Sequence, residues 1–312
     1  MPKCIDLKRS LVAVLGSALF MVAACDPGNS GNAGAPADKA AAAQQAALDN
    51  VEAMAREHAD DTAEASAGAQ IAPQRAVVAE RLPYAEVGDE LVYGYFVFPS
   101  DMVEPLPAVI MIHEWWGLND NIRAMADRLA AEGYIVLAID LFGGKVATTP
   151  EAARQLMLHV AENPKPAYDN IRQAYSFVNE TAAAPRIASL GWCFGGGWSL
   201  NTAMLFPDDL DAAVIYYGQV TDDEEQLRPV NLPILGFFGA KDAGIKVASV
   251  QAFEQALERL RKPHAIHIYP DADHAFANPT GRAYNAAAAD DAWQKTLQFL
   301  QRNLYAGGES GD

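Results

Sequence analysis

The chain is poor in positive charge. Its 312 residues include 23 lysines and arginines against 40 aspartates and glutamates, which gives a formal net charge of -17. The basic residues form no cluster beyond short pairs, whereas binding to a phosphate backbone needs grouped cations that release counterions. The composition therefore argues against nucleic acid as a partner.

The apolar run at the start of the chain, Leu11–Ala24, is too short to span a bilayer comfortably. A positively charged start precedes it, which is typical of a signal peptide. The string VAAC, ending at Cys25, resembles the lipobox of bacterial lipoproteins. We therefore expect residues 1–25 to be a signal peptide, with Cys25 lipidated and the protein anchored to a membrane facing the periplasm. The alternative is an ordinary secretory signal cleaved near Ala24.

Cysteine is scarce, with three residues in the whole chain. If residues 1–24 are removed and Cys25 is lipidated, Cys193 is left without a partner thiol. An exported compartment favours disulfides, so an unpaired thiol there needs another reason. The count indicates a chemical role for Cys193.

Residues 26–72 contain almost no aromatic or large aliphatic side chains, so they cannot bury enough apolar surface to fold alone. We expect this segment to be a low-complexity tether. Strong helix formers over Ala37–Ala65 and a thin apolar stripe predict a transient or solvent-exposed helix within it. His58 is expected to lie on the surface. The last residues, 307–312, are expected to form a frayed tail.

From residue 73 to 306, short apolar runs alternate with longer helical patterns. Val77–Arg81 and Leu91–Phe98 predict an antiparallel pair around a turn near Gly88. Five nearly continuous apolar runs follow, as in strands buried on both faces: PAVIMIH, YIVLAID, RIASLGW, AAVIYYG and PILGFFG. The alternation predicts one α/β domain with a mostly parallel central sheet and helices on both faces.

In such sheets the chemistry gathers where the strands end. Cys193 follows RIASLGW inside Gly191–Gly195, a segment with the G-x-nucleophile-x-G form of a nucleophile elbow. The small residues allow a sharp turn that presents the side chain above the sheet. A helix beginning just after it points its amino terminus at the sulfur and favours the thiolate. The alternative is a small core cysteine in a glycine-rich contact.

A nucleophile elbow needs an acid and then a histidine later in the chain. Asp242 follows PILGFFGA and His274 follows HIYPDAD, in that order. Asp271 and Asp273 are rival acids, but residues so close in sequence to His274 rarely reach its far ring nitrogen, so we favour Asp242. The alternative for Asp242 is a cap of the helix that begins near Lys246. His159, His264 and His267 are expected to be partly buried or surface histidines without a role in catalysis.

His113–Glu114 follows the first of the five runs, but Gly117 stands where a zinc-binding H-E-x-x-H motif requires histidine. We therefore expect no metal there, and without a dinucleotide fingerprint we expect no cofactor. Glu114 is better explained as a carboxylate partner of the thiol. The backbone amides of Trp115 and Phe194 are candidates for an oxyanion hole.

Four ordered motifs, HEWWGLND, GWCFGGG, GAKDAGI and YPDADHAFAN, together resemble the dienelactone hydrolase family of α/β-hydrolases over about Leu91–Leu304. The resemblance implies the α/β-hydrolase fold. It also implies Cys193 as nucleophile, His274 as base, Asp242 as its orienting acid and Glu114 as the group that helps to form the thiolate.

The sequence departs from that family where dienelactone-specific members hold the substrate carboxylate with two arginines. Here these positions are Asn278 and Gly144, with Lys145 as the only cationic neighbour. Each lost charged hydrogen bond is worth roughly 1.5 to 3 kcal/mol. The aromatic residues expected around the site are Trp116, Phe142, Trp192 and Phe276. We therefore predict a neutral or aromatic ester or lactone as substrate. The alternatives are a thioester or peptide hydrolase, and a non-catalytic binding lipoprotein on the same scaffold. The sequence does not indicate an oligomeric state.

Overall fold

The computed structural model describes residues 34–61, 63 and 72–305. The predicted signal peptide, the lipidation site Cys25 and the tail 307–312 lie outside the described residues, so the lipid anchor stays a prediction. No described helix is long and apolar enough to cross a membrane. The chain divides by its contacts into Met1–Ala41, of which only the first turns of one helix are described, and Ala42–Asp312.

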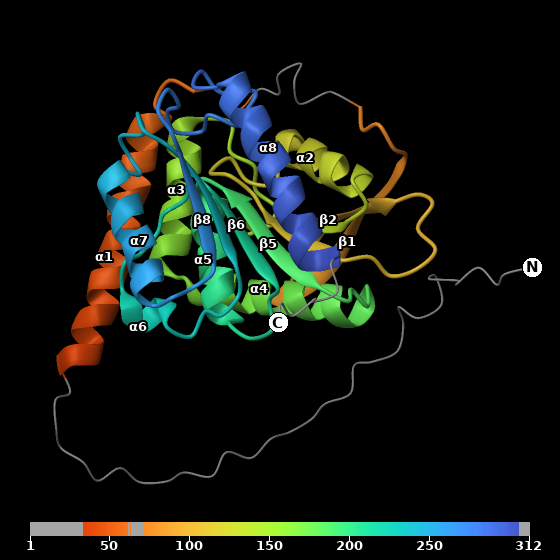
Figure 1. Ribbon diagram of the computed structural model, residues 1–312, viewed down its shortest axis with the longest axis horizontal. Coiled ribbons are helices and arrows are strands. Elements are labelled where there is room, and N and C mark those ends of the chain that lie inside the picture. Colours follow the sequence, from red (N-terminus) through yellow and green to blue (C-terminus); the bar gives the residue numbers. More distant parts are fainter. Residues whose placement is uncertain (1–33, 62, 64–71, 306–312) are drawn as a thin grey trace, which may run out of the picture. The chain divides into compact units, whose positions relative to one another are not determined.

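The larger unit contains an eight-stranded sheet in the order β1-β2-β4-β3-β5-β6-β7-β8 (Figure 1). Its strands are β1 (Val77–Val87), β2 (Glu90–Pro99), β3 (Ala108–Ile112), β4 (Ile135–Ile139), β5 (Ile187–Trp192), β6 (Ala212–Tyr216), β7 (Ile234–Gly239) and β8 (His264–Tyr269). β1 and β2 form the expected antiparallel hairpin, and β2 pairs antiparallel with β4. The remaining pairs are parallel. Every residue of β3 to β7 is buried, which explains why these strands read as continuous apolar runs.

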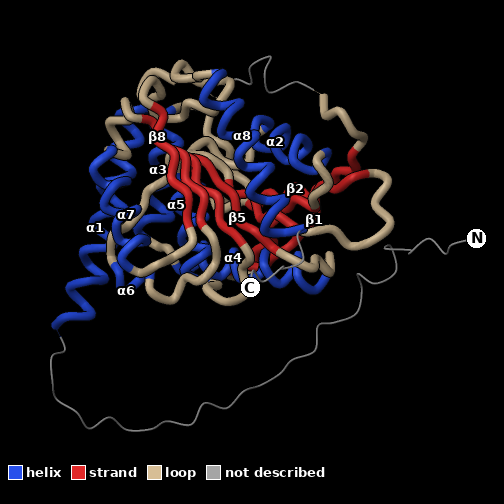
Figure 2. The backbone as a smooth tube through the Cα atoms, in the orientation of Figure 1, coloured by secondary structure: helices blue, strands red, loops and turns tan. Residues whose placement is uncertain are grey.

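Helices connect the strands and cover both faces of the sheet (Figure 2). They are α1 (Gly34–Glu57), α2 (Asp120–Ala131), α3 (Pro150–Glu162), α4 (Lys165–Ser176), α5 (Phe194–Leu205), α6 (Glu224–Leu227), α7 (Val247–Arg259) and α8 (Ala286–Leu300). Short π-helical turns continue α4 as Phe177–Thr181 and α8 as Gln301–Tyr305. The sequence prediction of an α/β domain with a mostly parallel sheet is confirmed. The short helix α6 was not predicted.

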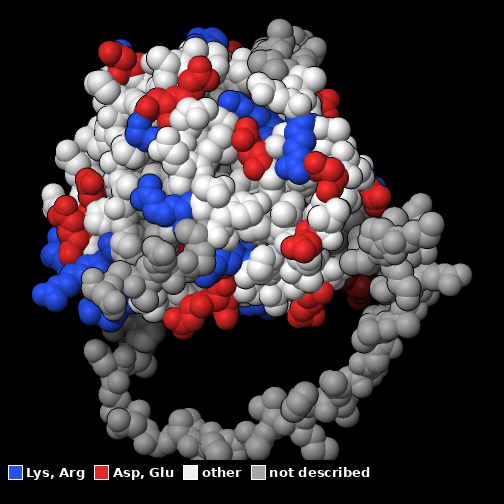
Figure 3. Space-filling view, turned by 45° about the vertical axis from the view of Figure 1, so that its right-hand side comes forward, with Lys and Arg blue, Asp and Glu red and all other residues white. Residues whose placement is uncertain are grey.

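Local signals set where several of these helices begin. The side chain of Asn119 accepts a hydrogen bond from the amide of Ile122 at the start of α2, and Thr149 does the same for Ala152 at the start of α3. Pro150 occupies the first position of α3, where its missing N–H costs nothing. Acidic and basic side chains are interspersed on the face shown in Figure 3.

Candidate active site

Cys193 lies between the end of β5 and the start of α5, in a conformation that non-glycine residues rarely adopt (φ 54°, ψ -117°). The glycines on either side make this turn possible. A Cβ added to Gly191 would lie 2.0 Å from the carbonyl oxygen of Gly195, and one added to Gly195 would lie 2.2 Å from that of Ile112. Side chains at either position would push the turn away from the sheet. The glycines therefore hold the nucleophile elbow against the ends of β3 and β5.

His274 and Asp242 meet in the loops that follow β8 and β7. The His274 Nδ1 lies 2.7 Å from the Asp242 Oδ2, and both side chains are buried. The other oxygen of Asp242 accepts hydrogen bonds from the amides of Gly244 and Ile245, at 2.8 and 2.7 Å. The carboxylate is thus fixed from both sides, and it in turn fixes the ring of His274.

The rival acids have other partners. Asp271 forms an ion pair with Lys241 at 3.2 Å, and Asp273 accepts a hydrogen bond from the backbone amide of His274. Of the three carboxylates near this histidine, it is Asp242 that holds the ring nitrogen.

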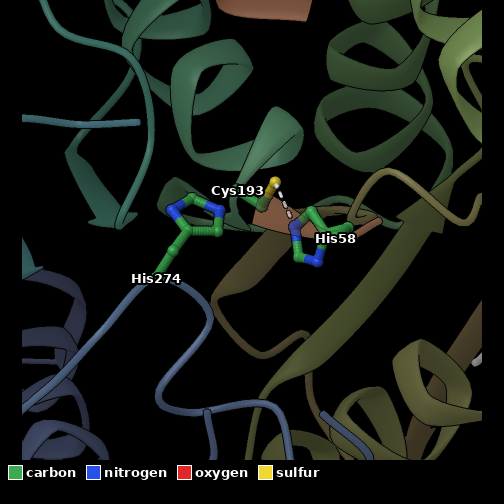
Figure 4. Close-up of side chains that lie close together, drawn as sticks. All are labelled: His58, Cys193 and His274. Atoms are coloured by element: carbon green, nitrogen blue, oxygen red, sulfur yellow. Dashed lines mark hydrogen bonds between the residues drawn. The ribbon is translucent and has the colours of Figure 1, made fainter. Parts of the chain in front are cut away.

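The sulfur of Cys193 lies between two imidazoles, those of His274 and His58 (Figure 4). One nitrogen of each ring and the sulfur all lie within 4.8 Å of one another. Burial disfavours the thiolate, but the two imidazoles outweigh it and lower the pKa of Cys193 to about 6. Burial likewise disfavours the imidazolium of His274, yet Cys193 and Asp242 raise its pKa well above the usual range. The geometry therefore favours a thiolate paired with an imidazolium.

His58 is the residue that sequence reasoning placed wrongly. It follows the last turn of α1, is 4% exposed, and lies with its Nε2 3.8 Å from the Cys193 sulfur. Its ring stacks on Trp115 with centroids 4.4 Å apart, and its Nδ1 lies 2.8 Å from the Asp61 Oδ2. The expectation of a surface histidine is wrong, because an apolar face and a carboxylate together bury the ring.

The second half of α1 packs onto the domain, so the expectation of a solvent-exposed helix is also wrong there. Val51 and Met54 are 3% and 1% exposed, and Glu52 forms an ion pair with Arg154 of α3. The sulfur of Met54 lies 3.6 Å from that of Cys193. Only 2% of Cys193 is exposed as a result. Met54 and His58 therefore cover the thiol.

Glu114 lies just past the end of β3 and is bound by two other side chains. Its carboxylate accepts hydrogen bonds from the Asn278 amide at 2.7 Å and from the Tyr217 hydroxyl at 3.3 Å. Burial and the neighbouring charge of Cys193 raise its pKa to about 7. Near neutral pH this carboxyl can therefore both hold and release a proton.

His113 precedes Glu114 and has a structural role. Its Nδ1 donates to the carbonyl oxygen of Glu114 at 2.7 Å, and its Nε2 accepts from the amide of Leu141 at 3.1 Å. Burial lowers its pKa, so the ring is neutral. These two bonds hold the strand end that carries Glu114 and Trp115.

A cavity of about 310 Å³ opens beside His274. Its lining residues are Glu57, His58, Asp61, Asp273, His274, Arg282 and Ala283. The residues expected as a pocket wall do not line it. Trp116, Phe142, Trp192, Phe276 and Asn278 are buried, and Lys145 is exposed. The aromatic rings instead pack against other rings of the core, for example Trp192 on Tyr216 with centroids 5.5 Å apart.

The residues of this site that were not predicted include Tyr217, His58 and Asp61. Tyr217 lies just past β6, so the rule that chemistry follows strand ends would have found it. His58 continues the stripe of Val51 and Met54 at intervals of three and four residues, and Asp61 follows it by three. Helical spacing alone thus placed His58 on the same face as the buried residues.

A strained elbow after a parallel strand, followed in chain order by an acid and a histidine, defines an α/β-hydrolase. The family model for the dienelactone hydrolase family matches residues 92–304, and the chain belongs to that family. A provisionally named carboxymethylenebutenolidase of Escherichia coli K12 is 31% identical to this chain over 253 residues. The matched region covers 76% of this chain and 91% of the E. coli protein. A protein of the same provisional name from Saccharolobus solfataricus is 33% identical over 235 residues, covering 64% of this chain and 90% of its own.

Solved structures show the same relationship. The crystal structure of a provisionally named dienelactone hydrolase from Klebsiella pneumoniae superposes with a TM-score of 0.65 at 28% identity. It covers 73% of this chain and 100% of that one. The chain is therefore a hydrolase of the dienelactone hydrolase family.

Proposed function

We propose that the protein hydrolyses carboxylic esters or lactones through Cys193, His274 and Asp242. The observation that carries the proposal is the thiol held in a strained elbow beside a histidine whose other nitrogen binds a buried carboxylate. The thiolate attacks the acyl carbon and forms a thioester, and the alcohol leaves with a proton from His274. His274 then takes a proton from water, whose oxygen attacks the thioester and releases the acid and the thiolate.

The negative charge that develops on the acyl oxygen needs donors. In this proposal they are the backbone amides of Trp115 and Phe194. The packing of Gly195 against the end of β3 places the start of α5 beside the segment that carries Trp115. Glu114 supplies a carboxyl group with a pKa near neutrality in the same buried region.

The charge near the site favours a neutral substrate. Three carboxylates, those of Glu57, Asp61 and Asp273, line the cavity. Arg282 lies 3.5 Å from the Asp61 carboxylate, which offsets its charge. Asn278 donates to Glu114 and offers no charge to a substrate carboxylate.

We therefore expect a neutral aryl ester to be hydrolysed with a kcat/KM at least about tenfold higher than its carboxylate-bearing analogue, because one missing charge-assisted hydrogen bond has this effect. The comparison is made on the full chain, with a thioester and a short peptide of the same acyl group in parallel. A preference for the anionic analogue would contradict the neutral-substrate proposal. Faster turnover of the thioester or peptide than of the ester would contradict the ester assignment.

The pH dependence of alkylation tests the nucleophile separately. A small electrophile reacts with the thiolate, so its rate with Cys193 should rise through pH 6 and level off above it, since the pKa is lowered from 9.0 to about 6. Replacing His58 by alanine removes one of the two imidazoles and should move the midpoint to higher pH. His159→Ala, an exposed position on α3, is the matched control and should leave it unchanged. A midpoint near 9.0 in the unaltered protein would contradict the assignment.

A further inference from the structure

Two histidine–aspartate pairs converge on one sulfur atom. His274 is bound through Nδ1 to Asp242 at 2.7 Å, and His58 through Nδ1 to Asp61 at 2.8 Å. The first pair belongs to the proposed triad, and the second comes from the segment that follows α1. Hydrolysis requires one such pair, and the second is additional to it.

We propose that Cys193, His58 and His274 form a binding site for a thiophilic divalent metal ion of the zinc class. One thiolate and two imidazoles are the donor types that zinc prefers. The three donor atoms lie within 4.8 Å of one another, and all three residues are buried.

A buried ring nitrogen between the three residues supports this assignment. The Nε2 of His274 is buried and has no hydrogen-bond partner among the residues that the structure describes. A buried ring nitrogen without a partner is costly, and once it releases its proton a metal ion satisfies it. Both rings are bonded at Nδ1 to a carboxylate, which fixes the tautomer that leaves Nε2 free. Metal-binding histidines are held in this way by a carboxylate behind the ring.

The separations also suit a metal ion. Tetrahedral zinc, with its usual bond lengths to sulfur and nitrogen, holds these two atoms about 3.6 Å apart. The Cys193 sulfur and the His58 Nε2 are 3.8 Å apart, so only small side-chain rotations are needed. The thioether of Met54, 3.6 Å from the same sulfur, adds a further soft neighbour.

Metal binding changes both the bonds and the protons at the site. One metal–sulfur and two metal–nitrogen bonds form, and the thiolate–imidazolium pair releases the imidazolium proton to solvent. The sulfur lone pair that attacks an ester is then occupied. The metal therefore inhibits hydrolysis reversibly, and it links the end of α1 to the elbow and to the loop after β8.

The test is a titration of the reduced full chain with Co²⁺, which replaces zinc and gives a thiolate-to-cobalt charge-transfer band. We expect a band that saturates at one equivalent and disappears when Zn²⁺ is added. Cys193→Ser should abolish the band, and His58→Ala should weaken Co²⁺ binding at least about tenfold. Exposed His159→Ala is the control and should bind as the unaltered protein does.

Asp61→Asn is a second test in case His58→Ala does not fold. This variant retains His58 and removes the carboxylate that orients its ring. Its affinity for Co²⁺ should fall about tenfold or more. No saturable band, or equal affinity in a folded His58→Ala or Asp61→Asn protein, would overturn the proposal. Because the band is read without substrate, its absence is distinguishable from a failure of the hydrolase assignment.

Discussion

Replacing Cys193 by alanine is expected to lower hydrolysis of a neutral aryl ester by at least about 10⁴-fold, because the nucleophile and the rest of a triad act as one unit. Without the sulfur no thioester forms, and His274 has no proton to transfer. The measurement is kcat/KM for the full chain and its variant. Trapping of the thioester by rapid acid quench should succeed with the unaltered protein and fail with the variant.

The control for this variant is its folded state. Alanine keeps the Cβ at the strained position and removes only the sulfur, so the melting temperature and the circular dichroism spectrum should change little. Activity retained in a folded Cys193→Ala protein would remove the nucleophile assignment.

Replacing Asp242 by asparagine is expected to lower kcat by about 10³- to 10⁴-fold. The amide nitrogen of asparagine can donate to Nδ1 of His274, which favours the tautomer whose proton sits on the other nitrogen. That tautomer cannot accept a proton at the sulfur side. Loss of the carboxylate also removes the charge that raises the pKa of His274, so the thiolate becomes less favourable and the alkylation midpoint of Cys193 should rise.

Asp271→Asn is the matched control for this change. Asp271 belongs to the loop that carries His274, but it is exposed and forms its ion pair with Lys241. Its replacement should leave kcat within about twofold, as is usual for exposed ion pairs. If Asp271→Asn lost as much activity as Asp242→Asn, the orienting role would belong to the loop rather than to one carboxylate.

The strands and most helices were predictable because their signals are local. A strand buried on both faces, such as Ile234–Gly239, must be apolar throughout, and this shows in the sequence without knowledge of its neighbours. The same holds for the glycines around Cys193, since the turn itself excludes side chains. The short helix α6 was missed because four residues carry too little periodicity.

The site was predictable only in part. The order of Cys193, Asp242 and His274 is visible in the chain, and the structure brings these three together. The residues that line the pocket were harder to predict from the sequence. Which aromatic residues face a cavity depends on how neighbouring elements pack, and those named from sequence pack against other buried aromatic rings instead.

Helix α1 shows both what composition can predict and what depends on tertiary contacts. Residues 26–72 have too few large apolar side chains to form a core of their own, and their composition shows this. The burial of Met54 and His58 depends on a surface built by residues far later in the chain, including Trp115 and Cys193. Composition and periodicity describe what a segment can do by itself, so they identified the elements and the order of the catalytic groups. The second imidazole beside the thiol became visible only in three dimensions, because a contact between distant segments depends on the whole fold.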